Sequence, residues 1–299
     1  MIQPPYLKKG DKIAIVSPAR SITFEEVHPS IRVFQKHGLE VVLGSHVFSK
    51  YHQFAGTDEQ RRMDFQQMLD DESIRAILCS RGGYGSVRII DRLDFTRFTE
   101  RPKWLIGYSD ITVFHAHFHT QLKTESLHAT MPKNILSDIP DDSLGTMINA
   151  LFGYHISYSY PRTAYSREGL AEGMLVGGNL SILINLMGSV TEIDTDGKIL
   201  FLEDVDEYLY HLDRMMMTMK RAGKLSRLKG LVVGGFSGMN DNLIPFGKTP
   251  AEIIAEAVSE YKYPVCFDFQ AGHLDKNLAL IFGRKIRLTI AKKTELSFY

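Results

Sequence analysis

The sequence predicts an α/β protein, with a doubly wound parallel sheet in the first half of the chain and a smaller mixed α/β domain after it. Strand-like and helix-like segments alternate through the first half, as they do in repeated βα units. The strand-like segments are short and almost wholly apolar, which is typical of parallel strands buried on both faces. The chain has 299 residues, and a domain size of about 150 residues predicts two domains.

The first half contains strand-helix units in regular order. Apolar runs predict strands at 12–16, 39–43, 74–79 and 104–106. Helices are expected at 24–37, 57–69, 87–93 and from 111 onward. Thr57 and Gln60 form a capping-box pattern that marks the start of the second helix. Because functional loops of a parallel sheet gather at the carboxyl ends of its strands, the residues after each strand are the first candidates for a site.

The regular pattern breaks at about residues 138–170, which we interpret as the crossing between domains. We therefore expect an N-terminal domain at 1–150, a linker at 151–168 and a C-terminal domain at 169–299. In the C-terminal domain, strands are expected at 199–203, 230–234, 264–269 and 278–282. Helices are expected near 180–188, 207–222 and 249–261. The order of these strands in the second sheet is left open.

The composition excludes several classes of partner. Thirty-five basic and 35 acidic residues cancel, and no basic run suggests a nucleic acid. The N-terminus lacks the apolar core of a signal peptide, and no apolar stretch reaches the roughly 18 residues that a membrane span needs. We therefore expect a soluble, cytoplasmic protein. Cys79 and Cys266 lie in apolar strand-like runs and are expected to be buried and reduced.

The sequence Gly-Tyr-Ser-Asp at 107–110 is the most informative motif. It stands between an expected strand and an expected helix. A serine at such a junction, here Ser109, resembles the nucleophile of a strand-turn-helix elbow, where the helix dipole favours a developing negative charge. The second glycine of the Gly-x-Ser-x-Gly form is missing, and a simple helix cap is the alternative.

A serine nucleophile needs a base, and the base needs an acid that orients it. Glu203 ends an apolar strand, which would bring its carboxylate to the edge of a sheet. His273 follows Gly272 in a loop after another expected strand. A solvated strand end and a surface histidine are the alternatives for these two residues. The chain order of serine, acid and histidine is the order found in α/β-hydrolases.

Stabilising an oxyanion requires two backbone N–H donors. The amide of Asp110, next to the serine, is one candidate. The glycine-rich loop at 81–86 supplies a second, from Gly82 or Gly83, because glycine lets the backbone approach a substrate closely. A phosphate-binding loop is the alternative for this segment, although its spacing fits no common phosphate motif.

Two clusters of possible metal ligands are interpreted as structural. Of the three alternating histidines at 115, 117 and 119, only His115 and His119 would share a helix face, and a third ligand is missing. The acidic residues after Glu203 suit the first turn of the helix expected there; they are Asp204, Asp206 and Glu207. We therefore expect no metal and no cofactor.

With these residues in place, nearly the whole chain resembles the LD-carboxypeptidase family of serine peptidases. The resemblance is carried by six blocks in the same order, at 10–18, 81–85, 107–112, 177–180, 202–204 and 272–277. The family includes muramoyltetrapeptide carboxypeptidases and microcin C self-immunity peptidases. Family members often have His-Gly-Pro where this chain runs from His128 to Pro132, so the role of that loop is left open.

The resemblance implies a flavodoxin-like N-terminal domain that carries the elbow and a swivelling-type C-terminal domain that carries the acid and the histidine. It implies that Ser109 is the nucleophile, His273 the general base and Glu203 the orienting acid. The amides of Gly83 and Asp110 would bind the oxyanion. A homodimer without a metal is also implied.

The implied reaction is hydrolysis of the amide between the L-centre of a diamino acid and a terminal D-alanine, as in the recycling of peptidoglycan tetrapeptides. The candidates for substrate binding are Arg81, whose charge suits the terminal carboxylate, together with Gly82 and Asn179. One alternative keeps the triad but cleaves aminoacyl-nucleotide amides, as in microcin immunity. The other is a module without enzymatic activity that binds a nucleotide or a phosphosugar at the glycine loop.

Overall fold

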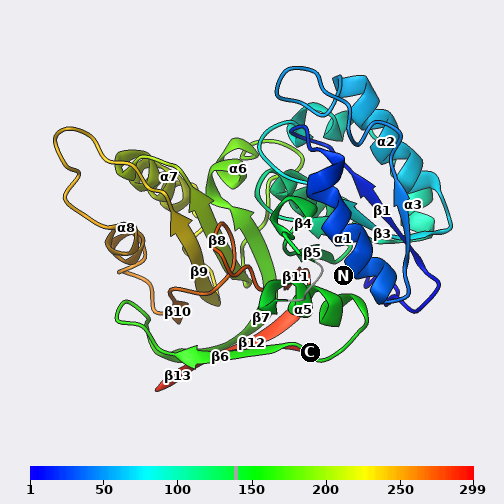
Figure 1. Cartoon of the computed structure of the whole chain (residues 1–299). Coiled ribbons are helices and arrows are strands. Elements are labelled where there is room, and N and C mark those ends of the chain that lie inside the picture. The colour runs from blue at the N-terminus through cyan, green and yellow to red at the C-terminus, as the bar shows by residue number, and fades with distance from the viewer. Residues whose placement is uncertain (138–140) are drawn as a thin grey trace.

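The computed structural model describes residues 1–137 and 141–299. It contains two domains that lie side by side (Figure 1). The first is built on a mainly parallel sheet and the second on a mixed sheet. The predicted fold class is confirmed by this architecture. The first three residues of the segment 138–170, in which the sequence pattern breaks, lie outside the described residues.

The first sheet has five parallel strands in the order β2-β1-β3-β4-β5, which is the flavodoxin-like order. Their bounds are Lys12–Val16 for β1, Glu40–Leu43 for β2, Ile74–Cys79 for β3, Trp104–Gly107 for β4 and Ser126–His128 for β5. A sixth strand, β11, pairs antiparallel with β5. It spans Leu280–Phe282 and comes from near the C-terminus of the chain.

Helices cover both faces of this sheet because side chains alternate along each strand. In β3, Leu78 packs in one cluster with Phe34 of α1, whereas Ile77 packs in another with Phe65 of α2. One face carries α1 (Phe24–Lys36) and α5 (Asp142–Leu151). The other carries α2 (Asp58–Asp70), α3 (Thr96–Glu100) and α4 (Thr112–Thr120).

The predicted capping box opens α2. The Thr57 side chain accepts a hydrogen bond from the Gln60 amide, and the Gln60 side chain accepts one from the Thr57 amide. The helix expected at 87–93 is instead two short 3-10 turns. Arg88 of the first turn is hydrogen-bonded to Asp58 at the start of α2, which ties this segment to the helix beside it.

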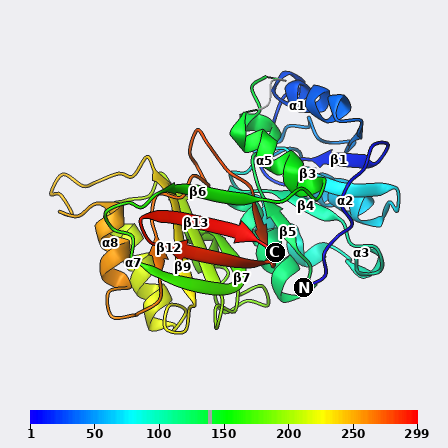
Figure 2. The same cartoon turned by 90° about the horizontal axis from the view of Figure 1, so that it is seen from below.

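The second sheet combines a parallel half with an antiparallel half (Figure 2). The long strand β7 (Gly169–Asn179) pairs with β8 (Ile199–Val205) through its second half, and β9 (Gly230–Ser237) and β10 (Val265–Cys266) follow in parallel. The first half of β7 pairs antiparallel with β12 (Lys285–Ile290), which is followed by β13 (Lys293–Phe298) and β6 (Ser157–Pro161). The helices are α6 (Leu180–Asn185), α7 (Leu209–Arg221) and α8 (Pro250–Ala257).

Two strands depart from the expected division of the chain. The segment 151–168, expected as a linker, contains β6, which is an edge strand of the second sheet. The strand β11 returns to the first sheet from the C-terminal part of the chain. The boundaries after residues 150 and 168 stay a prediction.

A buried ion pair holds the chain where it leaves β11. The Arg284 guanidinium lies 2.5 Å from Oε2 of Glu125, the residue before β5, and Nε of Arg284 lies 3.2 Å from Oε1. Both side chains are more than nine-tenths buried. Arg284 also donates to the Tyr6 hydroxyl at 3.0 Å. This cluster therefore connects the last third of the chain to the first sheet.

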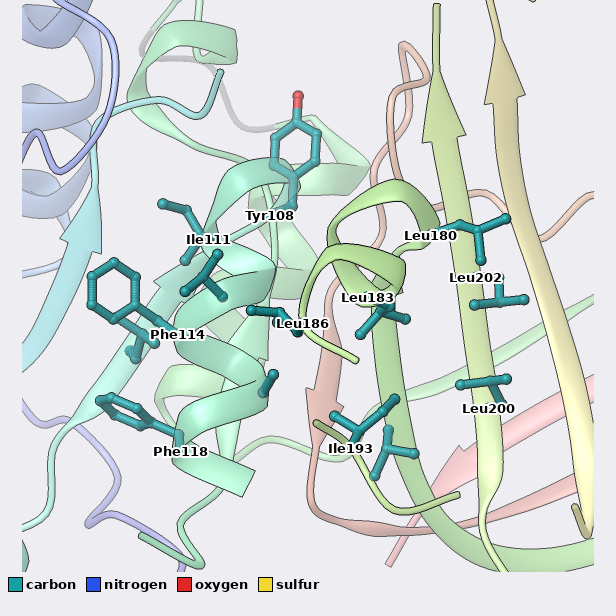
Figure 3. Close-up of a cluster of buried hydrophobic side chains, with 14 of the residues drawn as sticks. Tyr108, Ile111, Phe114, Phe118, Leu180, Leu183, Leu186, Ile193, Leu200 and Leu202 are labelled. Carbon is teal, nitrogen blue, oxygen red and sulfur yellow. The ribbon is translucent and has the colours of Figure 1, made fainter. Parts of the chain in front are cut away.

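One apolar cluster links the two domains next to the site described below (Figure 3). Phe114 and Phe118 of α4 lie in it together with Leu183 of α6 and Leu200 and Leu202 of β8. Because α4 follows Ser109 and β8 contains Glu203, this shared core fixes the two chain segments relative to each other.

Two further predictions concern the state of the cysteines and the presence of a membrane-spanning helix. Cys79 and Cys266 are both buried and unpaired, as predicted. Burial raises the pKa of the Cys266 thiol to about 12, so this residue stays protonated. In residues 1–137 and 141–299, no helix combines the length and apolar character needed to cross a bilayer.

Candidate active site

Ser109 stands in a strained turn between β4 and α4. Its φ is +65°, a region that residues other than glycine seldom adopt. Gly107 has φ +154°, and a Cβ there would lie 2.9 Å from Cγ1 of Ile111. Ser109 does not cap α4, since Ile111 is the N-cap residue and makes no side-chain cap. The turn is therefore an elbow that presents the serine rather than a helix cap.

The three predicted catalytic residues meet in one hydrogen-bonded series. Nε2 of His273 lies 3.1 Å from Oγ of Ser109, and Nδ1 of His273 lies 2.7 Å from Oε2 of Glu203. The backbone amide of His273 also points to Oε2 of Glu203, at 3.3 Å. The geometry is that of a nucleophile, a base and an acid that orients the base, assembled from β4, β8 and a loop after β10.

Gly272 lets the histidine loop approach Glu203 closely. Its φ is +101°, and a Cβ would lie 2.7 Å from Cβ of Glu203. Its amide donates to Oδ1 of Asn277 at 2.9 Å, which closes the loop on itself. A side chain at position 272 would therefore push the His273 ring away from its acid.

The electrostatics favour a protonated histidine during the reaction. Burial lowers the pKa of His273, but the hydrogen bond and the charge of Glu203 and the nearby charge of Asp204 outweigh it, and the pKa is raised above its usual value. Glu203 is fully buried. An imidazolium at position 273 is thus stabilised by a carboxylate that has no access to solvent.

Asp204 corrects one expectation from the sequence. The sequence predicts Asp204, Asp206 and Glu207 in the first turn of the following helix, but α7 begins at Leu209 and has no acidic residue in its first turn. Asp204 is instead a buried residue of β8, and it accepts hydrogen bonds from Nδ2 of Asn179 and from the amide of Ser181, both at 2.9 Å. Burial, followed by the charge of Glu203, raises the pKa of Asp204 to about 7. The strand β8 runs on through Asp204 to Val205, and no local pattern in the sequence predicts that this carboxylate is buried.

Asn179 does not reach the serine. Its side chain is buried, accepts a hydrogen bond from the Ile182 amide and donates to Asp204, so it caps α6. Its amide donates to Oγ1 of Thr112 at 3.0 Å. Because Thr112 begins α4, Asn179 holds the second domain against the helix that follows the elbow.

The glycine loop after β3 lies directly against the serine. A Cβ on Gly82 would come within 2.8 Å of Cβ of Ser109 and within 3.3 Å of the Asp110 amide nitrogen. The carboxylate of Asp110 is buried and accepts a hydrogen bond from the Ser86 amide at 2.9 Å. Arg61, also buried, donates to the Gly85 carbonyl at 3.0 Å. These contacts hold the loop so that its backbone and the Asp110 amide border the same space beside Oγ.

A cavity of about 470 Å³ opens over the serine and the histidine. Arg81, Gly82 and Gly83 line it. It is also lined by charged residues that sequence reasoning assigned no part in binding: Arg20, Lys133, Asp206 and Glu207. Arg20 and Lys133 follow β1 and β5, so the rule that sites form at the carboxyl ends of parallel strands could have found them.

The loop that departs from the family motif contacts the site through Tyr108. The Tyr108 hydroxyl donates to Oδ1 of Asn134 at 3.1 Å, and its ring centroid lies 4.9 Å from that of His273. His128 is fully buried and also packs against Tyr108, at 5.8 Å between ring centroids. Met131 lines the cavity. The segment from His128 to Asn134 therefore supports the Tyr108 ring, which lies beside His273.

Gly82→Ala should lower kcat/KM about 100-fold, because a reacting atom displaced by about 1 Å costs that much. The crowding should also lower the free energy of unfolding, by about 1–3 kcal/mol. The added methyl group would meet Cβ and Oγ of Ser109 at 2.8 and 2.9 Å. Steady-state kinetics and thermal unfolding measure the two effects. Gly145→Ala in α5 is the matched control, since a Cβ there has no neighbour within 4 Å. Full activity of Gly82→Ala would show that the loop does not press on Ser109.

Comparison with known proteins identifies relatives for both halves of the chain. Residues 13–129 match the model of the LD-carboxypeptidase N-terminal domain, and residues 172–288 match that of the LD-carboxypeptidase C-terminal domain. The chain is 32% identical to a probable murein peptide carboxypeptidase of Bacillus subtilis, over 98% of this chain and 93% of that protein. It is 29% identical to the murein tetrapeptide carboxypeptidase of Pseudomonas aeruginosa, over 91% of each chain.

Solved structures agree with this fold. The crystal structure of muramoyltetrapeptide carboxypeptidase from Oxalobacter formigenes superposes with a TM-score of 0.86, at 26% identity, over 96% of this chain and 98% of that one. The microcin C7 self-immunity protein MccF, in complex with aspartyl sulfamoyl adenosine, has a TM-score of 0.89 at 19% identity, over 100% and 99% of the two chains. At that identity the second likeness concerns the fold alone.

Proposed function

We propose that this chain, which belongs to the LD-carboxypeptidase family, is a serine carboxypeptidase that releases the terminal D-alanine from a murein tetrapeptide. The single observation that carries the proposal is the hydrogen-bonded series Ser109, His273 and Glu203 at the base of a cavity. Relatives named as murein peptide carboxypeptidases support the substrate. The scissile bond is the amide between the L-centre of a diamino acid and D-alanine.

In the proposed mechanism, Nε2 of His273 accepts the proton of Ser109 as Oγ attacks the carbonyl carbon. Glu203 stabilises the imidazolium that forms. The amides of Asp110 and Gly83 would donate to the oxyanion, and the positive end of α4 lies on the same side. His273 then returns its proton to the amine of the leaving D-alanine, which breaks the amide and leaves an acyl ester on Ser109. A water molecule, deprotonated by His273, hydrolyses this ester.

The carboxylate of the leaving D-alanine needs a cation, and three line the cavity. Arg81 donates to the Ser21 carbonyl at 2.9 Å. A carbonyl is neutral, so this hydrogen bond does not cancel the positive charge of the guanidinium. Lys133 is paired with Glu26. Arg20 packs under Gly83, where a Cβ would lie 2.5 Å from its Cδ. We assign the carboxylate to Arg81 and Arg20, with the Gly82 backbone beside them.

The cytoplasmic location and the homodimer expected from the sequence belong to the same proposal. Cell fractionation with an antibody against the chain tests the location. Light scattering during size-exclusion chromatography tests the oligomeric state. A monomer at the concentration of the activity assay would remove the dimer from the proposal and leave the reaction unaffected.

Mass spectrometry of L-Ala-γ-D-Glu-meso-diaminopimelyl-D-Ala incubated with the protein tests the reaction. Loss of one D-alanine is the expected result. If folded protein leaves the peptide intact, an aminoacyl sulfamoyl adenylate is the next substrate, and its cleavage would favour the microcin-immunity alternative. Failure with both substrates, together with thermal stabilisation by a nucleotide or a phosphosugar, would favour a binding module.

The raised pKa of His273 predicts a shifted pH profile. The general base must be neutral, so kcat/KM should fall as the pH drops through the pKa of His273. Because that pKa is raised, the midpoint of the acid limb should lie above the usual histidine value of about 6.5. Glu203→Gln removes the anion that raises it, so the midpoint should move to lower pH while kcat falls by about 10⁴-fold.

Rates measured from about pH 5 to 9 would resolve this limb. Glu295→Gln, on an exposed position of β13, is the control. An acid limb that keeps its midpoint in Glu203→Gln would mean that a group other than His273 controls it.

A further inference from the structure

The positively and negatively charged residues around the cavity come from different domains. The lining residues from the loops of the first sheet include Arg20, Arg81 and Lys133, whereas Asp206 and Glu207 directly follow β8 of the second sheet. Ser109 and His273 line the same cavity. A substrate at the serine would therefore have cations on one flank and carboxylates on the other.

The side-chain partners of the two carboxylates are an amide and an imidazole. Oδ1 of Asp206 accepts from Nδ2 of Asn240 at 2.8 Å. Oε2 of Glu207 lies 2.5 Å from Nδ1 of His211. In the part of the chain that the structure describes, no lysine or arginine forms an ion pair with either residue, although most of the carboxylates in ion pairs elsewhere have such a partner. Two neighbouring carboxylates at the rim of a cavity thus create a local negative field that favours a cation.

The backbone fixes where these carboxylates stand. Asp206 has φ +58°, and its amide donates to the Ser237 carbonyl at 3.0 Å. The Asn240 amide donates to the Glu207 carbonyl at 2.8 Å. Both residues lie directly after β8, in the short connection to α7, and these two hydrogen bonds tie that connection to the end of β9 and the residues after it.

We propose that Asp206 and Glu207 bind the side-chain ammonium group of the residue whose carbonyl Ser109 attacks. This inference rests on the proposed function and adds a requirement to it. The cationic flank takes the terminal carboxylate of the leaving residue, so the acidic flank is left for the acyl side of the scissile bond. The enzyme therefore selects a diamino acid with a free amine and discriminates against the same peptide when that amine is part of an amide, because acylation removes the charge.

Steady-state kinetics on three synthetic peptides test the proposal. The peptides have the form L-Ala-γ-D-Glu-X-D-Ala, where X is L-lysine, Nε-acetyl-L-lysine or L-norleucine. Loss of an ionic hydrogen bond changes kcat/KM by about 10- to 100-fold, so lysine should be preferred over both neutral residues by that factor. Glu207→Gln and Asp206→Asn should lower the ratio of lysine to norleucine by raising KM for the lysine peptide. Asparagine tolerates the positive φ at position 206, which keeps the second variant folded.

The controls separate the possible failures. Glu295→Gln, which lies on β13 away from the cavity, should keep the wild-type ratio. Equal turnover of the lysine and norleucine peptides by wild type would overturn the ammonium subsite and leave the carboxypeptidase proposal standing. If folded wild type cleaves none of the three peptides and also leaves the meso-diaminopimelyl peptide intact, the proposed function itself fails. Cleavage of the meso-diaminopimelyl peptide alone would overturn the ammonium subsite, because the lysine ammonium would then not suffice for recognition. A loss in Glu207→Gln that is equal for lysine and norleucine would assign the residue a structural role instead.

Discussion

Ser109→Ala and His273→Ala are each expected to lower kcat for D-alanine release by about 10⁴- to 10⁶-fold. Alanine at position 109 removes the atom that would form the acyl ester. Alanine at position 273 removes the only base within hydrogen-bond distance of Oγ in the described residues. The double variant should be hardly slower than either single variant, because the two residues act in the same step.

Quantification of D-alanine by chromatography over long incubations measures rates this low. Ser159→Ala and His155→Ala make the same changes at exposed positions and should keep wild-type kcat. Thermal unfolding should show that Ser109→Ala is folded. Turnover within tenfold of wild type in either site variant would end the serine mechanism.

Arg284→Met is expected to reduce the free energy of unfolding by about 3–5 kcal/mol, because it leaves the Glu125 carboxylate buried without its partner. Few single substitutions cost as much, since folded domains are stable by about 5–15 kcal/mol in total. The Tyr6 hydroxyl loses a hydrogen bond in the same variant. Glu125→Gln combined with Arg284→Met should be less damaging than Arg284→Met alone, since the stranded charge is then removed.

Urea unfolding followed by tryptophan fluorescence suits this experiment, because Trp104 packs near Arg284, at 5.9 Å from the guanidinium carbon to the ring centroid. The matched control is Arg101→Met. Arg101 pairs with Glu72 at 2.5 Å, but both side chains are more than half exposed, so the change should stay within about 1 kcal/mol. Equal costs for the buried and the exposed pair would show that burial of the ion pair contributes nothing.

Local signals explain which parts of the fold and site were predictable. The strands of the first sheet follow from apolar runs, and the start of α2 follows from the Thr57 capping box. Ser109, Glu203 and His273 each stand at the end of a strand-like run or beside a glycine, which marks them before any contact is known. That the three side chains come within hydrogen-bond distance depends on how the two sheets pack. From the sequence, only the family resemblance predicted that contact.

The features that the sequence did not provide are all non-local. Nothing near residues 280–282 indicates that they join the first sheet, since their partner β5 lies about 150 positions earlier in the chain. Asp204 has the same character as a solvated helix start, and only its contact with Asn179 and Ser181 shows why it is buried. Arg20 and Lys133 have no motif of their own and become candidates only once the cavity is known.

The pairing of β11 with the first sheet has a consequence for folding during synthesis on the ribosome. When β5 leaves the exit tunnel, its outer edge has no partner, and unpaired strand edges are sites of wrong association. The strand that covers it is translated about 150 residues later, a delay of about 8–30 s at ordinary elongation rates. The N-terminal half therefore waits for nearly the whole polypeptide before its sheet is complete, and a ribosome that stalls in this interval would release a chain prone to aggregate.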